Sequence, residues 1–182
     1  MASTIFNFAD FTSFAGETEL NDTTYATIAR GIIDYVENQY KIHFSDTIIT
    51  LPIWLESGQT TIDAPVYPMN NIVKVEYDGV ELTSDEYSWY GRDILLVTAL
   101  TDIRKPITFT LDVGFETSIP GDIKLAVYRH IMSVYFSIKK HTDNLEKAVN
   151  SQGNTSYYAQ DVMPIASKQT YEYYTARRLI DF

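Results

Sequence analysis

The sequence predicts an α+β fold, in which a small helical core carries a small, mostly antiparallel β-sheet and hairpin insertion. Two segments, near residues 22–39 and 121–141, place apolar side chains at helical spacing. Between them, residues 47–113 are rich in β-branched and aromatic residues interrupted by turn sequences, which is typical of short strands. The 182 residues are 45% hydrophobic, enough for one core of ordinary size, so we expect residues 1–182 to form a single domain.

The first 20 residues are expected to form an N-terminal arm. They contain four phenylalanines separated by small and polar residues, without a strong helical period. We predict an extended arm or a short helical piece. Because exposed phenylalanine rings are unfavourable, this arm must dock on another surface.

The first long helix is predicted to begin at Asn21 or Asp22, because a short side-chain oxygen can accept hydrogen bonds from the free N–H groups of the first turn. Its apolar stripe has the spacing of one helix face and consists of Tyr25, Ile28, Ala29, Ile32, Tyr35 and Val36.

Residues 47–113 predict five or six short strands. Pro52 within TIITLPIWL indicates an edge strand or a break, because proline cannot donate to a sheet. Asp78–Gly79 favours a tight hairpin turn, since both residues adopt positive φ readily. The strict alternation of residues 107–113 predicts a strand with one buried face, formed by Ile107, Phe109, Leu111 and Val113.

The second long helix begins after Pro120, a residue that fits a first helical turn. This helix is apolar around most of its circumference, which indicates burial on more than one side, and we expect part of it to face another chain. The core is thus predicted to span residues 21–141. A polar loop at 142–163 and an extended or short-helical tail at 164–182 are expected to follow.

The net charge of −10 is unevenly distributed. Residues 1–116 have a net charge of −12, whereas residues 117–182 have +2. Neutralising phosphates requires lysine and arginine, so the acidic body argues against general nucleic-acid binding. Two interpretations stay open, namely simple solubility and an acidic surface past which DNA moves without binding.

The sequence predicts no catalytic, cofactor or metal residues. Cysteine is absent, and His43, His130 and His141 are scattered without a metal-binding spacing. No phosphate-binding loop or nucleophile elbow occurs, and neither a signal peptide nor a membrane-spanning run is expected. The alternative enzyme hypothesis is a small hydrolase or ligand-binding domain with an acid–base pair, formed by Asp85 and Glu86 or by Asp46 and Glu56.

The C-terminal sequence Arg-Arg-Leu-Ile-Asp-Phe (residues 177–182) has two interpretations. It is either a terminus that packs back on the body or a docking peptide. In a docking peptide the apolar side chains fill pockets of a partner and the arginines pair with its carboxylates.

A strand that ends in Gly-Phe, a short link and the helix start IPGDIKLAVYRHIMSVY follow one another in residues 113–135. This segment, and the order of the elements TTYATIARGIIDYVENQY, IITLPIW, TTIDAPVYPMNNIVKVEYDGVEL and YSWYGRDILLV before it, resembles the head–tail connector (adaptor) proteins of tailed bacteriophages. The resemblance covers about residues 22–182. It implies a structural, non-enzymatic virion protein without a cofactor, made in the host cytoplasm and located in the neck.

In that family, the resemblance implies, the subunits form a ring, usually of twelve, that docks on the portal protein and extends the DNA channel. The ring contacts neighbouring copies and the next neck or tail protein, and DNA passes without sequence-specific binding; no membrane is involved. The implied portal-docking residues are Tyr171, Tyr174, Arg177, Arg178, Leu179 and Phe182. The implied subunit contacts are in the two long helices and include Tyr128, Met132 and Tyr135. A stopper or tail-completion protein of the same neck is the alternative.

Overall fold

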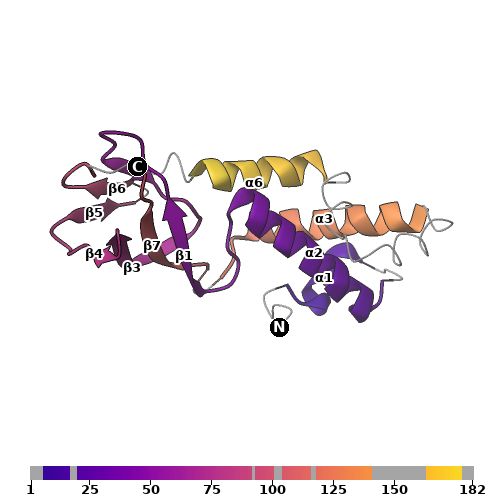
Figure 1. The fold of residues 1–182 in the computed structure, drawn as a ribbon. Helices are drawn as coiled ribbons and strands as arrows, with labels where there is room; N and C mark the ends of the chain where they lie inside the picture. The colour runs from indigo at the N-terminus through magenta and orange to yellow at the C-terminus, as the bar shows by residue number, and fades with distance from the viewer. Residues whose placement is uncertain are drawn as a thin grey trace. The chain divides into compact units, whose positions relative to one another are not determined.

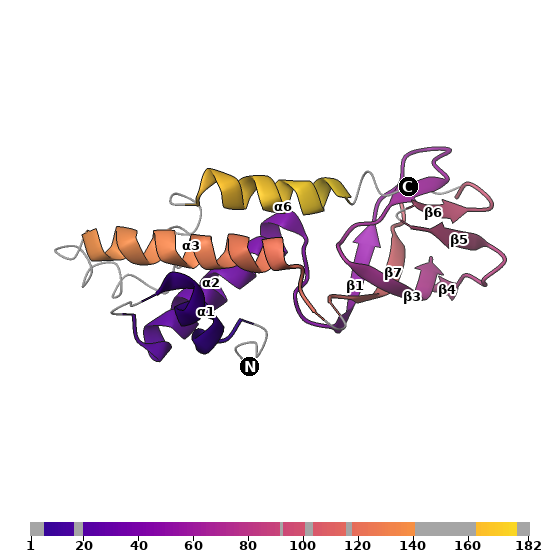
Figure 2. The same ribbon diagram turned by 180° about the vertical axis from the view of Figure 1, so that it is seen from behind.

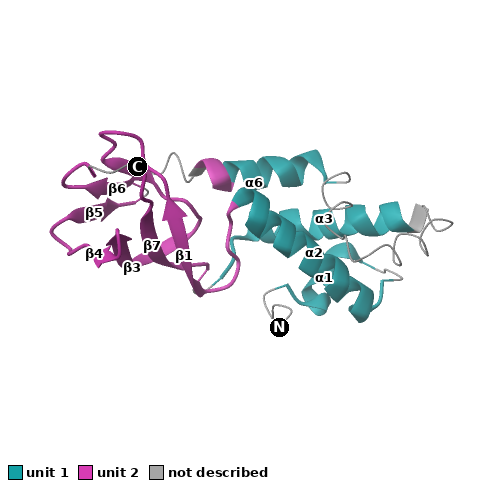
Figure 3. Cartoon of the chain, in the orientation of Figure 1, with its two compact units in different colours: residues 1–40, 117–173 teal, residues 41–116, 174–182 magenta. Residues whose placement is uncertain are grey.

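The fold comes from a computed structural model, which describes residues 6–16, 20–91, 93–100, 104–115, 118–140 and 163–177. The chain comprises two compact units (Figure 3). The first, here called the helical unit, contains Met1–Tyr40 and Thr117–Tyr173, and the second, the β unit, contains Lys41–Glu116 and Tyr174–Phe182. The insertion predicted at residues 47–113 lies within the β unit.

The helical unit contains α1 (Phe8–Ala15), α2 (Asp22–Tyr40), α3 (Gly121–Lys140) and most of α6 (Ile165–Arg177), as Figure 1 shows. The two long helices predicted from the sequence are confirmed as α2 and α3. Asn21 caps α2, because its Oδ1 accepts a hydrogen bond from the Thr24 N–H at 2.8 Å. The Pro120 carbonyl accepts the Lys124 N–H at 3.0 Å, which closes the first turn of α3.

The phenylalanine-rich arm docks on the helical unit, as predicted. The Asn7 side chain accepts the Asp10 N–H at 2.7 Å and caps α1. Phe6 and Phe11 are buried, and the ring centroid of Phe11 lies 4.8 Å from that of Tyr25 in α2. The arm is therefore part of the helical core.

The β unit contains two antiparallel sheets. The larger has the order β1-β7-β3-β4, with β1 (Thr47–Ile53), β7 (Ile107–Val113), β3 (Met69–Tyr77) and β4 (Val80–Glu81). The smaller has the order β2-β6-β5, with β2 (Thr61–Asp63), β6 (Asp93–Leu96) and β5 (Tyr87–Tyr90). The antiparallel character is confirmed, but the strands divide between two sheets instead of one, because periodicity identifies strands without specifying their partners. Figure 2 shows the same strands from behind.

The local signals in the β unit are borne out. Pro52 lies in β1, which is an edge strand. Asp78 and Gly79 have φ angles of 54° and 77°, as a tight hairpin turn between β3 and β4 requires. All four inward-facing residues of β7 are fully buried, and they form the centre of the core between β1 and β3.

Candidate assembly interface

Much of the apolar surface of helix α3 is covered by other segments of the same chain. Ile123, Val127 and Ile131 are fully buried in the unit. Three phenylalanines of the N-terminal segment surround Tyr128, with ring centroids 5.7–6.1 Å away for Phe14, Phe11 and Phe6. Tyr128 is only 5% exposed, so it is a core residue of this chain. The apolar surface of α3 had suggested a contact with another chain. Part of that surface is instead covered by the N-terminal arm.

The outer part of α3 retains the other two residues predicted at a subunit contact. Met132 and Tyr135 are half-buried. The Tyr135 ring lies 5.6 Å from the ring of Phe136, which is 48% exposed. These residues keep part of their surface accessible in the described structure, and their role in a subunit contact stays a prediction.

Helix α6 buries one face, which includes two tyrosines expected in the docking tail. Tyr171 is fully buried, with its ring centroid 5.2 Å from Tyr40 and 6.2 Å from His130. The buried Ser167 hydroxyl donates to the Ala126 carbonyl at 2.8 Å, which ties α6 to α3. Tyr174, in the β unit, is also buried, and its ring lies 5.6 Å from that of Tyr67.

Both tyrosines are therefore buried in this chain, and the portal-docking role predicted for the tail stays a prediction. Sequence reasoning missed this burial. Ser167, Tyr171 and Tyr174 recur at positions i, i+4 and i+7, which is the signal of a buried helix face. The side chain of Arg177 and residues Arg178, Leu179 and Phe182 lie outside the described part of the chain.

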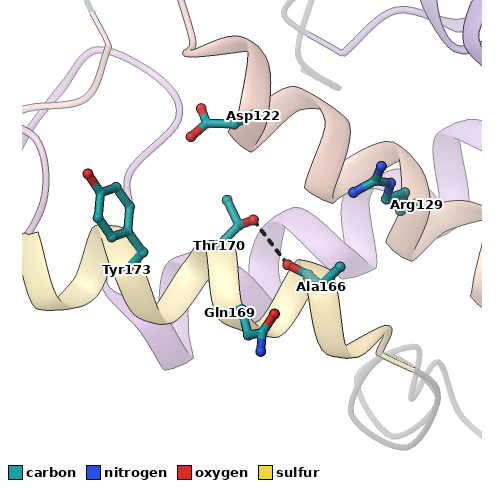
Figure 4. Close-up of a pocket in the computed structure, with 6 residues that line it drawn as sticks. All are labelled: Asp122, Arg129, Ala166, Gln169, Thr170 and Tyr173. Carbon is teal, nitrogen blue, oxygen red and sulfur yellow. Dashed lines mark hydrogen bonds between the residues drawn. The ribbon is translucent and has the colours of Figure 1, made fainter.

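A groove of about 350 Å³ lies between α3 and α6 in the helical unit (Figure 4). Helix α3 contributes Asp122 and Arg129, and α6 contributes the remaining residues, Ala166, Gln169, Thr170 and Tyr173. The Thr170 hydroxyl donates to the Ala166 carbonyl at 3.0 Å, within α6. No sequence motif pointed to this groove, because it arises from the pairing of two helices far apart in the chain.

Arg129 is the notable cation of this groove. It is exposed, and it has no hydrogen-bond or ion-pair partner among the residues described. In contrast, the Lys124 Nζ lies 3.9 Å from the Asp10 carboxylate, and the Lys168 Nζ lies 3.6 Å from that of Glu172. At the other end of the groove the Asp122 carboxylate accepts the Ile123 N–H at 2.9 Å.

The β unit exposes several large apolar side chains. Ile48 on the edge strand β1 is 63% exposed, and Trp54 just beyond that strand is 64% exposed. Tyr90 at the end of β5 is 70% exposed. Tryptophan and tyrosine are enriched at protein interfaces relative to the rest of the protein surface.

The smaller sheet also carries an unusual charged row. Asp63 and Asp93 are directly opposite each other in the register of β2 and β6, and Tyr90 is opposite Asp93 on β5. Both carboxylates are exposed, and neither has a hydrogen-bond or ion-pair partner in the described ranges. Like charges in directly opposed positions destabilise a sheet.

A second cavity, of about 360 Å³, lies in the β unit. Its lining is largely apolar and includes Leu82, Leu96 and Leu100. Its one carboxylate, Glu86, accepts hydrogen bonds from the Thr83 N–H at 2.7 Å and the Thr83 hydroxyl at 2.9 Å, and these bonds lower the pKa of Glu86. The Glu86 carboxylate is thus engaged in hydrogen bonds within its own turn.

The acid–base alternative gains no support from either cavity, since neither contains two carboxylates or His43. Asp46 instead lies near Asp112, whose pKa is raised by desolvation and further by the Asp46 carboxylate. Within the described residues, no group of three or more histidine, aspartate or glutamate side chains could hold a metal ion. Over the same residues, no helix has the length and apolarity needed to cross a membrane.

Comparison with known proteins gives a structural answer and no sequence match. No protein-family model matches, and no curated protein matches. A chain in the neck of a native gene transfer agent (GTA) particle, computed with C12 symmetry, superposes with a TM-score of 0.57 at 15% identity, over 73% of this chain and 78% of that one. Over that part, this chain shares the fold of a chain in the GTA neck.

Two further structures agree. A chain in the neck of an empty GTA particle, computed with C6 symmetry, gives a TM-score of 0.56 at 16% identity over 74% of this chain and 78% of that one. A chain in the virion of a native GTA particle gives 0.57 at 13% identity over 74% and 78%. Identities this low establish the shared fold.

Proposed function

We propose that this chain is a structural neck protein of a phage-like particle, a head–tail connector of the adaptor type. The fold shared with GTA neck chains over about three quarters of the sequence carries this proposal. The resemblance of residues 113–135 to the adaptor family supports it from the sequence alone. The protein acts by assembly and not by catalysis, and its place is the neck of the virion.

The proposed assembly is a ring, dodecameric by the family resemblance, that docks on the portal protein. A closed ring requires a heterologous contact, in which two different surfaces of each subunit are complementary. The two units provide such different surfaces, one a helical groove and one a β unit with exposed aromatic rings. The other face of the ring would receive the next neck or tail protein.

The acidic composition suits a subunit that surrounds moving DNA. With a net charge of −10, the chain has too few cations to neutralise many phosphates. Acidic side chains repel the DNA backbone, so the ring extends the channel without binding the passing DNA tightly.

Portal attachment is assigned to the end of the tail, Arg177, Arg178, Leu179 and Phe182. Arginines pair well with carboxylates in two-bond geometry, and large apolar side chains fill pockets. Removing Ala176–Phe182 should leave both units folded, because Tyr171 and Tyr174 remain, and should abolish portal binding. Normal portal binding by this truncated chain would contradict the tail assignment. Lys168→Ala, which removes an exposed charge from α6, serves as the control.

The alternative within the same neck is a stopper or tail-completion protein. Direct binding to the portal is what the adaptor assignment requires. We would mix the full chain with the portal of its own particle and image the products by electron microscopy. Rings on the portal are expected. A chain that stays strictly monomeric and never binds the portal would overturn the adaptor function.

A further inference from the structure

The groove between α3 and α6 has the composition of an interface centre. Arg129 and Tyr173 belong to residue types that dominate binding energy at protein contacts, and Tyr173 is 52% exposed. Arg129 presents its charge without a partner among the described residues. An exposed, unpaired guanidinium in a concave site fits an occupant that carries a carboxylate.

The Asp63–Asp93 row of the β unit is complementary to this groove. Its two carboxylates face outward side by side, and a guanidinium that bridges them would relieve their mutual repulsion. The exposed Tyr90 in the same row supplies an aromatic ring beside the charge. The row belongs to one unit and the groove to the other, so the chain carries both halves of a heterologous contact.

We propose that the α3–α6 groove binds the Asp63–Asp93 row of a neighbouring copy of this chain, with Arg129 placed between the two carboxylates. The inference rests on the proposed ring, and it identifies the surfaces through which the subunits meet. The guanidinium of Arg129 in one copy thus meets the acidic row of the next.

The observations favour a second copy over nucleic acid as the occupant. A phosphate backbone would need several cations, whereas the described groove has one unpaired cation and the Asp122 carboxylate at its other end. The five N–H donors of a single arginine are enough to contact two neighbouring carboxylates.

The direct test exchanges the charges. Arg129→Glu in one variant, and Asp63→Lys with Asp93→Lys in another, should each weaken ring formation by about tenfold or more, because like charges then meet. A chain with all three substitutions should recover most of the association. Matched controls are Lys168→Glu, whose lysine is already paired with Glu172, and Asp85→Lys at an exposed position of the β unit. Circular dichroism of each variant confirms that it is folded.

The absence of cysteine allows a second test that detects even a weak contact. A chain with Arg129→Cys is mixed with a chain with Asp93→Cys and treated with a short bismaleimide cross-linker, on the portal where rings need it. The mixture should give cross-linked dimers, and either variant alone should give few.

The outcomes separate this inference from the function on which it rests. Rings that form normally in both charge-reversal variants, or a mixture that does not cross-link, would overturn the contact and leave the neck function standing. Intact rings that lose portal binding on Arg129→Glu would assign the groove to the portal and also overturn it. If wild-type chains never form rings, the proposed function fails first, and the contact fails with it.

Discussion

The two units of this chain bury their apolar residues in different ways. In the helical unit, rings from the arm, α2 and α6 surround α3, as the contacts of Phe11 and Tyr171 show. In the β unit, aliphatic side chains pack around β7, whose Phe109 is fully buried, while Trp54 and Tyr90 stay exposed. Much of the apolar surface of α3, which we expected to face another chain in part, is therefore covered by its own chain. The groove between α3 and α6 was not predicted from the sequence.

The largest effect is expected in the β unit, at Phe109 of the central strand. Phe109→Ala removes a fully buried ring between two flanking strands and should lower the free energy of unfolding by about 3–5 kcal/mol. Urea denaturation followed by circular dichroism measures this loss. Val97→Ala, at an exposed position, should change stability by less than about 0.5 kcal/mol. Equal losses in both variants would show that β7 is not the centre of the core.

The corresponding position of the helical unit is Tyr171. Tyr171→Ala should cost about 3–5 kcal/mol, since it empties a buried site beside Tyr40 and His130. Its buried hydroxyl has no hydrogen-bond partner in the described part of the chain, so Tyr171→Phe should change stability by less than about 1 kcal/mol or raise it. Portal binding should survive Tyr171→Phe, and a loss of binding with intact stability would restore a docking role to this residue.

A smaller loss of folding stability is expected from a substitution at Gly114, where β7 ends. Gly114 has φ +105°, and a Cβ atom there would lie 2.1 Å from the Ser45 carbonyl oxygen. Gly114→Ala therefore adds a backbone clash to the conformational cost of about 1–2 kcal/mol that a side chain meets at positive φ. Gly58, with φ +80° and open space around it, is the matched control and should show the conformational cost alone. Thermal unfolding of the two variants compares them, and similar melting temperatures would contradict the close approach of Ser45.

The smallest effect is a pH dependence in the β unit. Burial, and secondarily the charge of Lys41, lowers the pKa of His43 below its usual 6.5. The unfolded chain then binds the proton more readily, so the stabilisation is complete above pH 6.5 and is lost as the pH falls toward the folded-state pKa. His43→Gln should flatten the pH profile of unfolding in this window. An unchanged profile would show that His43 does not contribute.

The sequence was enough to predict local structure wherever a single short-range rule determines that structure. Periodicity alone predicted both long helices and all four buried residues of β7, and the turn chemistry of Asp78–Gly79 predicted the hairpin. Contacts between distant segments did not follow. The pattern shows that Tyr128 prefers burial but not that the N-terminal arm covers it, and the pairing of Asp63 with Asp93 depends on a register that no local signal contains.

The central claim, that copies of this chain form a ring on a portal, is tested most directly by the mass of the complex. Native mass spectrometry of the full chain bound to the portal of its own particle would give the number of copies. A defined complex with one ring of this chain per portal, dodecameric by the family resemblance, is the predicted result. A portal that keeps its own mass in the presence of excess chain would contradict the account.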